Sequence, residues 1–128
     1  MNLVIPAGLR TVKITNETMV AFGAFSDCKT LSSISISNIA VTIDDSCFNG
    51  CSNLANITLP FAGKSKTANS ANPRYDLFGY AFGPTSYAGS YTANQYYSNQ
   101  TSSYAYSIPT SLTSVSITDA TQFSEGAF

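Results

Sequence analysis

An apolar phrase of the form Leu-x-x-(Val/Ile)-x-(Ile/Leu) occurs four times, and this repetition constrains the fold more than any other feature. The four copies lie at residues 9–14, 31–36, 54–59 and 112–117. The first three, which begin at Leu9, Leu31 and Leu54, are almost evenly spaced. A repeating period of this size is typical of proteins built from stacked units, because each unit is too short to bury its own apolar face. We therefore expect a stack of coils.

Within each phrase the last two apolar residues alternate with polar ones, which is the pattern of a half-buried strand. Since the phrase is the same in each copy, we expect parallel strands that stack equivalent side chains in one buried ladder. The residues of this ladder are Val12, Ile34, Ile57 and Val115. The predicted fold class is a mainly β repeat solenoid.

A second phrase, a small residue followed by Phe, comes after three of the copies. Its occurrences are Ala24-Phe25, Cys47-Phe48 and Ala127-Phe128. The chain would return through this phrase along the other side of each coil, with the Phe ring in the interior. We therefore predict that Phe25 and Phe48 are buried in neighbouring coils.

The three cysteines, Cys28, Cys47 and Cys51, are interpreted as buried free thiols of the repeats. Their spacing contains no Cys-x-x-Cys zinc pattern. Cys28 and Cys51 hold equivalent positions in the repeat, so a disulfide between them is an alternative, although it would leave one thiol unpaired.

A longer period lies over the short one. The stretch Ile-Pro-x-x-Leu-x-x-Val-x-Ile-Thr occurs at residues 5–15 and again at 108–118. The sequence therefore reads as one long unit and the start of the next. We expect it to be a piece of a longer array whose neighbouring repeats are its first partners.

Three stretches together resemble the BspA-like leucine-rich-repeat family of bacterial and protist surface proteins: IPxxLxxVxI, AFxxCxxLxxIxI and CFxxCxxLxxITLPF. Residues 77–87, LFGYAFGPTSY, resemble a block often placed between repeats of these arrays. The chain departs from the family at Cys47, where Ala is usual, and at residues 41–45. The resemblance implies a right-handed horseshoe or arc, a cell-surface location, and adhesion or ligand binding. It implies no catalytic residues.

A Tyr-rich insertion separates the third and fourth copies of the first phrase, since the interval from Leu54 to Leu112 is more than twice that between the earlier copies. We divide the chain into repeats over residues 1–61, the insertion over 62–107, and an incomplete further repeat over 108–128. All eight tyrosines lie in the insertion. Tyrosine among Ser, Gly and Asn is also the composition of antibody paratopes.

The aromatic residues of the insertion divide into two groups. Leu77, Phe78, Tyr80 and Phe82 alternate with small residues, and we expect them to fold back onto the repeat core. The candidate ligand contacts are Tyr91, Tyr96, Tyr97, Tyr104 and Tyr106. If these residues bind a ligand, their exposed rings should form one contiguous patch; packing in the core is the alternative.

The polar positions between the ladder residues form a second candidate surface, a nearly uncharged row of Ser and Thr side chains. The concave face of a solenoid is a recurring binding surface. This one lacks the aromatic or Arg anchors of an interface, and Thr favours exposed strands for its propensity alone. We therefore favour a purely structural role for it.

Composition excludes several functions. Six basic and seven acidic residues give a net charge of −1, so neither nucleic acid nor an anionic membrane surface is an expected partner. The chain has no His, which removes Ser-His-Asp catalysis and imidazole metal sites. Asp44 and Asp45 are adjacent and point opposite ways on an extended segment, so they form no glycosidase pair. A turn or a weak Ca²⁺ contact there stays open.

The sequence thus predicts a segment of a secreted or cell-surface protein that acts by adhesion, without catalytic residues, cofactor or metal. Its ligand would be a host or extracellular protein or a glycan. No apolar run approaches the roughly 20 residues of a membrane helix, so no membrane insertion is expected. The alternative is a structural stalk that presents other domains.

Overall fold

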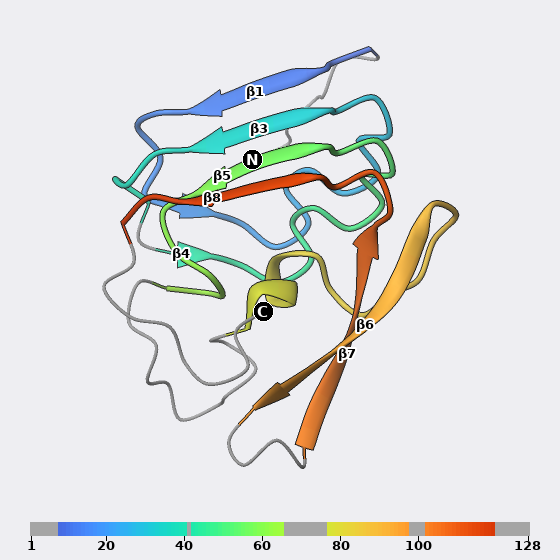
Figure 1. Cartoon of the computed structure of the whole chain (residues 1–128). Helices are drawn as coiled ribbons and strands as arrows, with labels where there is room; N and C mark the ends of the chain where they lie inside the picture. The colour runs from blue at the N-terminus through green and yellow to red at the C-terminus, as the bar shows by residue number, and fades with distance from the viewer. Residues whose placement is uncertain (1–7, 41, 66–76, 98–101, 120–128) are drawn as a thin grey trace.

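The computed structural model describes residues 8–40, 42–65, 77–97 and 102–119 (Figure 1). The strands are β1 (Thr11–Ile14), β2 (Met19–Val20), β3 (Ser33–Ile36), β4 (Thr42–Ile43), β5 (Asn56–Leu59), β6 (Ser90–Tyr97), β7 (Ser102–Pro109) and β8 (Ser114–Ile117), and a 3₁₀ helix, η2 (Phe78–Ala81), precedes β6. In these ranges no helix is long and apolar enough to span a membrane.

The four copies of the first phrase form one parallel sheet in the order β1-β3-β5-β8 (Figure 1). The register places the predicted ladder residues opposite one another, in the sequence Val12, Ile34, Ile57, Val115. The parallel stacking of the phrases is confirmed. It follows from the shared pattern, since a slip by one residue would turn every apolar side chain to the opposite face.

Burial along this ladder depends on the position of each strand in the sheet. Ile34 and Ile57 are each 1% exposed, because strands flank them on both sides. Val12 on β1 is partly buried, and Val115 on β8 is 38% exposed. The prediction that all four are buried is wrong for Val115. Within the described residues, β8 has a neighbouring strand on one side only.

The other face of the sheet carries polar side chains in two aligned rows. One row holds Thr11, Ser33, Asn56 and Ser114, and the next holds Lys13, Ser35, Thr58 and Ser116. All eight are exposed or half-buried, and only Lys13 is charged. With strands about 4.8 Å apart, this face is an almost neutral array of short polar groups.

The return side of the coils contains the second phrase and the short parallel pair β2–β4. Phe25 is 7% exposed and Phe48 is fully buried. Their rings stack with centroids 6.2 Å apart and planes inclined by 19°. The Phe25 N–H donates a hydrogen bond to the Cys47 carbonyl over 2.8 Å. The predicted burial of both phenylalanines in neighbouring coils is confirmed.

A third copy of the second phrase lies within the predicted insertion, as Ala81-Phe82, and the sequence analysis missed it. The Phe48 N–H donates to the Ala81 carbonyl over 3.0 Å, just as Phe25 N–H donates to Cys47. The Phe82 ring lies 5.8 Å from the Phe48 ring and is fully buried. The stack of phenylalanine rings therefore continues through three successive coils.

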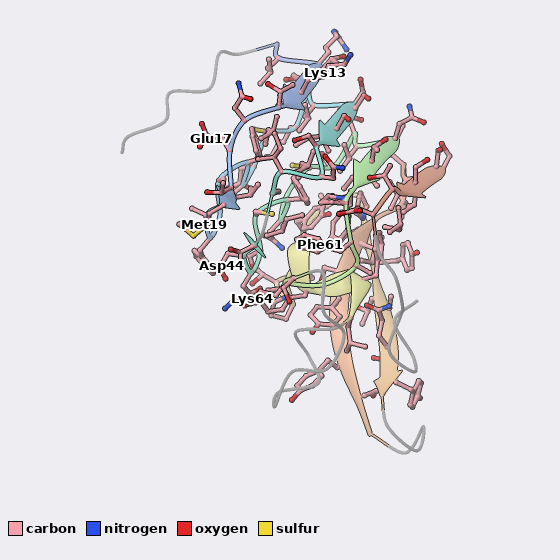
Figure 2. The ribbon with its side chains drawn as sticks, turned by 90° about the vertical axis from the view of Figure 1, so that its left-hand side faces the viewer. Lys13, Glu17, Met19, Asp44, Phe61 and Lys64 are labelled. Atoms are coloured by element: carbon pink, nitrogen blue, oxygen red, sulfur yellow. The ribbon has the colours of Figure 1, made fainter. Side chains whose placement is uncertain are left out.

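The segment around this copy belongs to the core. Leu77 is fully buried, and Phe78 and Tyr80 are less than a tenth exposed. The expectation that these residues fold back onto the repeats is confirmed. Leu77 and Phe78 belong to the same buried cluster as Phe61, which is 1% exposed and lies in the interior (Figure 2).

The cysteines are buried free thiols, as predicted. The Cys51 thiol donates a hydrogen bond to the Phe25 carbonyl over 3.1 Å. Burial raises the pKa of Cys51 to about 12, and the neighbouring Cys28 adds to the rise. Burial likewise holds the pKa of Cys47 well above its ordinary value. The described residues contain no group of acidic or cysteine side chains that could hold a metal ion.

Candidate ligand-binding surface

The part of the insertion that leaves the repeats is an antiparallel hairpin of β6 and β7 (Figure 1). Its base is tied by Thr110, whose N–H donates to the Gly89 carbonyl over 2.8 Å. The register pairs Tyr91 with Ile108 and Ala93 with Tyr106. Residues paired across a hairpin point to the same face, and successive residues alternate between faces.

This alternation divides the candidate tyrosines between two faces. Tyr91, Tyr104 and Tyr106 share the face that contains Ile108, whereas Tyr96 lies on the opposite face. Tyr91 is 53% exposed and Tyr96 is 45% exposed. The side chain of Tyr97 lies outside the described part of the structure. The expectation of one contiguous patch on a single side is therefore wrong, because it did not include the pairing of the two strands.

Tyr106 is a core residue. It is 2% exposed, and its ring lies against Gly79 of η2, where a Cβ atom would overlap the ring. The Tyr104 ring, half-buried, lies 6.4 Å from it. Tyr106 was a candidate ligand contact with packing in the core as the alternative, and the structure places it in the contact between the hairpin and the repeats. The hairpin face that carries Tyr106 is therefore the one that packs against η2.

Gln95 strengthens the same contact. It is 7% exposed, and its Oε1 atom accepts a hydrogen bond from the Gly79 N–H. A buried amide with such a partner avoids most of the cost of desolvation. The inner face of the hairpin is therefore fixed to η2 by both a ring contact and a hydrogen bond.

A groove of about 330 Å³ lies between the hairpin, η2 and the start of β8. Its lining consists of Phe78, Tyr91, Ala93, Asn94, Gln95, Ile108, Leu112, Thr113 and Val115. None of these side chains is charged. The groove therefore combines apolar walls with a few amide and hydroxyl groups, and two of its residues, Tyr91 and Val115, are the large apolar groups exposed nearby.

Tyr87, in the turn before β6, has a buried hydroxyl with no hydrogen-bond partner among the described residues. Burial raises the pKa of this phenol to about 12, and the Cys51 thiol contributes to the rise. Both effects favour the neutral hydroxyl.

Asp44 and Asp45 form local hydrogen bonds at a turn. Asp44 Oδ1 accepts from the Tyr80 hydroxyl over 3.2 Å and from the Asp45 N–H over 2.8 Å. Asp45 Oδ1 accepts from the Ser46 hydroxyl over 2.9 Å. Ser46 has a positive φ of 59°, so the two carboxylates lie where the chain bends sharply. Asp44 lies near Met19 on the side of the repeats away from the four-stranded sheet (Figure 2).

The groove could not be found from the sequence, because its walls come from three distant segments. Val115 was assigned to the repeat ladder, Leu112 to the same repeat phrase, and Phe78 to the core. The one signal was that β8 (Ser114–Ile117) follows the insertion within a few residues, so the inserted segment precedes this strand closely in the sequence.

Residues 7–71 match the family described as "BspA type Leucine rich repeat region (6 copies)". No curated protein and no solved structure matches the chain. The family match covers just over half of the chain and ends before η2 and the hairpin. Repeats of this kind are typically protein-interaction modules rather than enzymes. The match confirms the resemblance noted in the sequence, and the chain belongs to the BspA-type leucine-rich repeat family.

Proposed function

We propose that this chain is a non-catalytic adhesion or ligand-binding segment of a secreted or cell-surface protein, and that the groove at the base of the hairpin is its contact surface. The coils would continue as a right-handed arc. The family supports this proposal, since its repeats typically serve protein interaction and occur in surface or secreted proteins.

The observation that carries the proposal is the groove together with Tyr91 at its wall. Tyr91 leaves 53% of its surface exposed although its neighbours on the same hairpin face are buried or half-buried. An exposed aromatic ring beside amide and hydroxyl groups can contact a ligand by its face while these groups form hydrogen bonds. Tyrosine is also among the residues that dominate interface energies.

The lining predicts the chemistry of the ligand. An anionic or cationic group would find no opposite charge in the groove and would lose its hydration there. An uncharged ligand fits better, either a glycan or an extended protein segment with apolar and uncharged polar side chains. Such a ligand is consistent with an extracellular partner.

The alternative is a structural stalk, and one observation favours it. Half of the aromatic side chains that the structure describes in the insertion serve the core: Phe78, Tyr80, Phe82 and Tyr106 are all less than a tenth exposed. In a stalk, the hairpin would only fill the space between successive coils, and Tyr91 would be incidental.

An array of immobilised glycans and extracellular-matrix proteins separates the two functions. We expect the intact chain to bind a defined subset of the array and the Tyr91→Ala variant to lose that subset while keeping its thermal unfolding temperature. Absence of binding across the array, or binding that Tyr91→Ala leaves unchanged, would favour the stalk.

A further inference from the structure

Strand β6 of the hairpin has one edge without a partner strand. Within residues 8–40, 42–65, 77–97 and 102–119, β6 pairs with β7 alone. Both views show the hairpin projecting from the stacked coils (Figure 1, Figure 2). A two-stranded ribbon is only marginally stable by itself, and an unpaired edge is a template for another strand. The edge of β6 is therefore a place where a third strand can add.

A hydrogen bond at the base of the hairpin fixes which backbone groups of β6 face this edge. Opposite residues of an antiparallel pair alternate between bonded and non-bonded pairs. The Thr110 N–H donates over 2.8 Å to the carbonyl of Gly89, the residue opposite it when the register is continued by one position. The pair that contains Thr92 lies an odd number of positions away and is therefore non-bonded. The N–H and C=O groups of Thr92 thus point away from β7, and those of Asn94 do the same.

The outer edge of β7 is less open than that of β6. The Ser107 N–H, which the same alternation turns away from β6, donates to the Gly83 carbonyl over 2.9 Å. Pro109, the last residue of β7, has no N–H. The β6 sequence, SYTANQYY, contains neither a proline nor a charged residue, which are common means of protecting a sheet edge. Strand addition is therefore directed to β6.

We propose that the ligand of the groove is an extended segment of a partner protein, which adds to the free edge of β6 as a third strand. This inference rests on the proposed function, because it names the ligand class of the same groove. It selects the protein segment over the glycan, since a peptide backbone presents donors and acceptors at the same spacing as those of Thr92 and Asn94.

The groove defines the side chains that the added strand would carry. The residues of β6 that line it are Tyr91, Ala93, Asn94 and Gln95. Alternate side chains of an added strand lie on the same face as Tyr91 and Ala93. They would enter the groove, where no lining side chain is charged. The remaining side chains would lie on the opposite face, beside the exposed Thr92. The partner segment therefore alternates apolar with uncharged polar residues.

Synthetic peptides of alternating Val and Thr, as long as β6, are the probe. We expect the intact chain to bind them in titration calorimetry. Two further series carry N-methyl groups on the Val amides or on the Thr amides. Because only alternate amides of a strand face a given neighbour, one series should lose binding and the other should keep it within about twofold. Loss in both series, or in neither, would overturn strand addition.

A proline on β6 tests the same contact from the protein side. Thr92→Pro removes an N–H from the free edge at a residue outside the groove lining, and proline is tolerated at sheet edges. It should weaken binding of the unmethylated peptide by about tenfold or more. Ala105, opposite Asn94 in the register, has its N–H on the outer edge of β7. The matched control Ala105→Pro should therefore bind the peptide like the unaltered chain.

The outcomes separate this inference from the proposed function. A glycan ligand that Tyr91→Ala loses and Thr92→Pro binds unchanged would overturn strand addition and leave the groove as the binding surface. Ligand binding that neither variant alters would overturn both. Equal losses of peptide binding in Thr92→Pro and Ala105→Pro would overturn strand addition alone. So would an intact chain that ignores the peptides and sediments at twice the monomer mass, because a second copy would then occupy the edge. If Thr92→Pro loses its circular dichroism spectrum, the N-methylated peptides decide.

Discussion

The ring of Tyr106 lies against the α-carbon of Gly79, in the space that a side chain at position 79 would fill. This contact fixes the hairpin to η2. Gly79→Ala should therefore lower the free energy of unfolding by about 1–3 kcal/mol, the usual cost of overpacking a core. Urea unfolding followed by circular dichroism measures this change.

A double-mutant cycle tests whether that cost comes from this contact. In a Tyr106→Ala background the ring is gone, so adding Gly79→Ala should cost less than about 0.5 kcal/mol. If the two changes were simply additive, the effect of Gly79→Ala would have to come from the backbone and not from Tyr106.

The third copy of the second phrase gives the next prediction. Phe82 is fully buried against Phe48, so Phe82→Ala should cost about 3–5 kcal/mol of stability. Phe22 is a matched control, since it is 68% exposed, and Phe22→Ala should change stability by less than about 0.5 kcal/mol. Equal effects of the two changes in thermal unfolding would remove Phe82 from the core.

Removing two buried tyrosine hydroxyls, those of Tyr87 and Tyr80, should change the free energy of unfolding in opposite directions. The Tyr87 hydroxyl lacks a partner in the described residues, so Tyr87→Phe should raise the free energy of unfolding by about 1 kcal/mol by removing a desolvated group. The Tyr80 hydroxyl donates to Asp44, so Tyr80→Phe should lower it by about 1 kcal/mol. Chemical unfolding of the two variants side by side provides the comparison, and a loss of stability in Tyr87→Phe would show that its hydroxyl has a partner.

Alkaline conditions should weaken the fold through Cys51. Its pKa is about 12 in the folded chain against an ordinary 9.0, so folding favours the protonated thiol. The contribution of this thiol to the free energy of unfolding is fully present below about pH 9. It falls by about 1.4 kcal/mol per pH unit as the pH rises toward 12. Urea unfolding between pH 8 and 11 should show a steeper decline for the unaltered chain than for Cys51→Ala. Parallel declines would contradict the assignment to this thiol.

The repeat ladder was predictable because the same apolar positions recur at nearly equal spacing, and equivalent residues stack in a parallel sheet. The third Phe of the return side was not, because the interval from Phe48 to Phe82 is clearly longer than the interval from Phe25 to Phe48. The intervening residues hid a repeat position inside a stretch that resembled an insertion.

The candidate site was predictable only in composition. Tyrosine density identified the segment, but the face on which each ring lies depends on the pairing of β6 with β7. That pairing buries Tyr106 and separates Tyr96 from Tyr91. Tyr106 on β7 packs against Gly79 of η2, and the whole of β6 lies between these two residues in the sequence. The periodicity of a single strand therefore cannot show which face of the hairpin meets η2.

The most direct test of the proposed binding groove is the dissociation constant of an array ligand for Tyr91→Ala and Tyr96→Ala, measured by titration calorimetry. Both tyrosines are about half exposed, but only Tyr91 lines the groove. We predict that Tyr91→Ala weakens binding about 30-fold, equivalent to about 2 kcal/mol, and that Tyr96→Ala changes it less than about twofold. An unchanged dissociation constant for Tyr91→Ala, or an equal loss in both variants, would contradict binding in the groove.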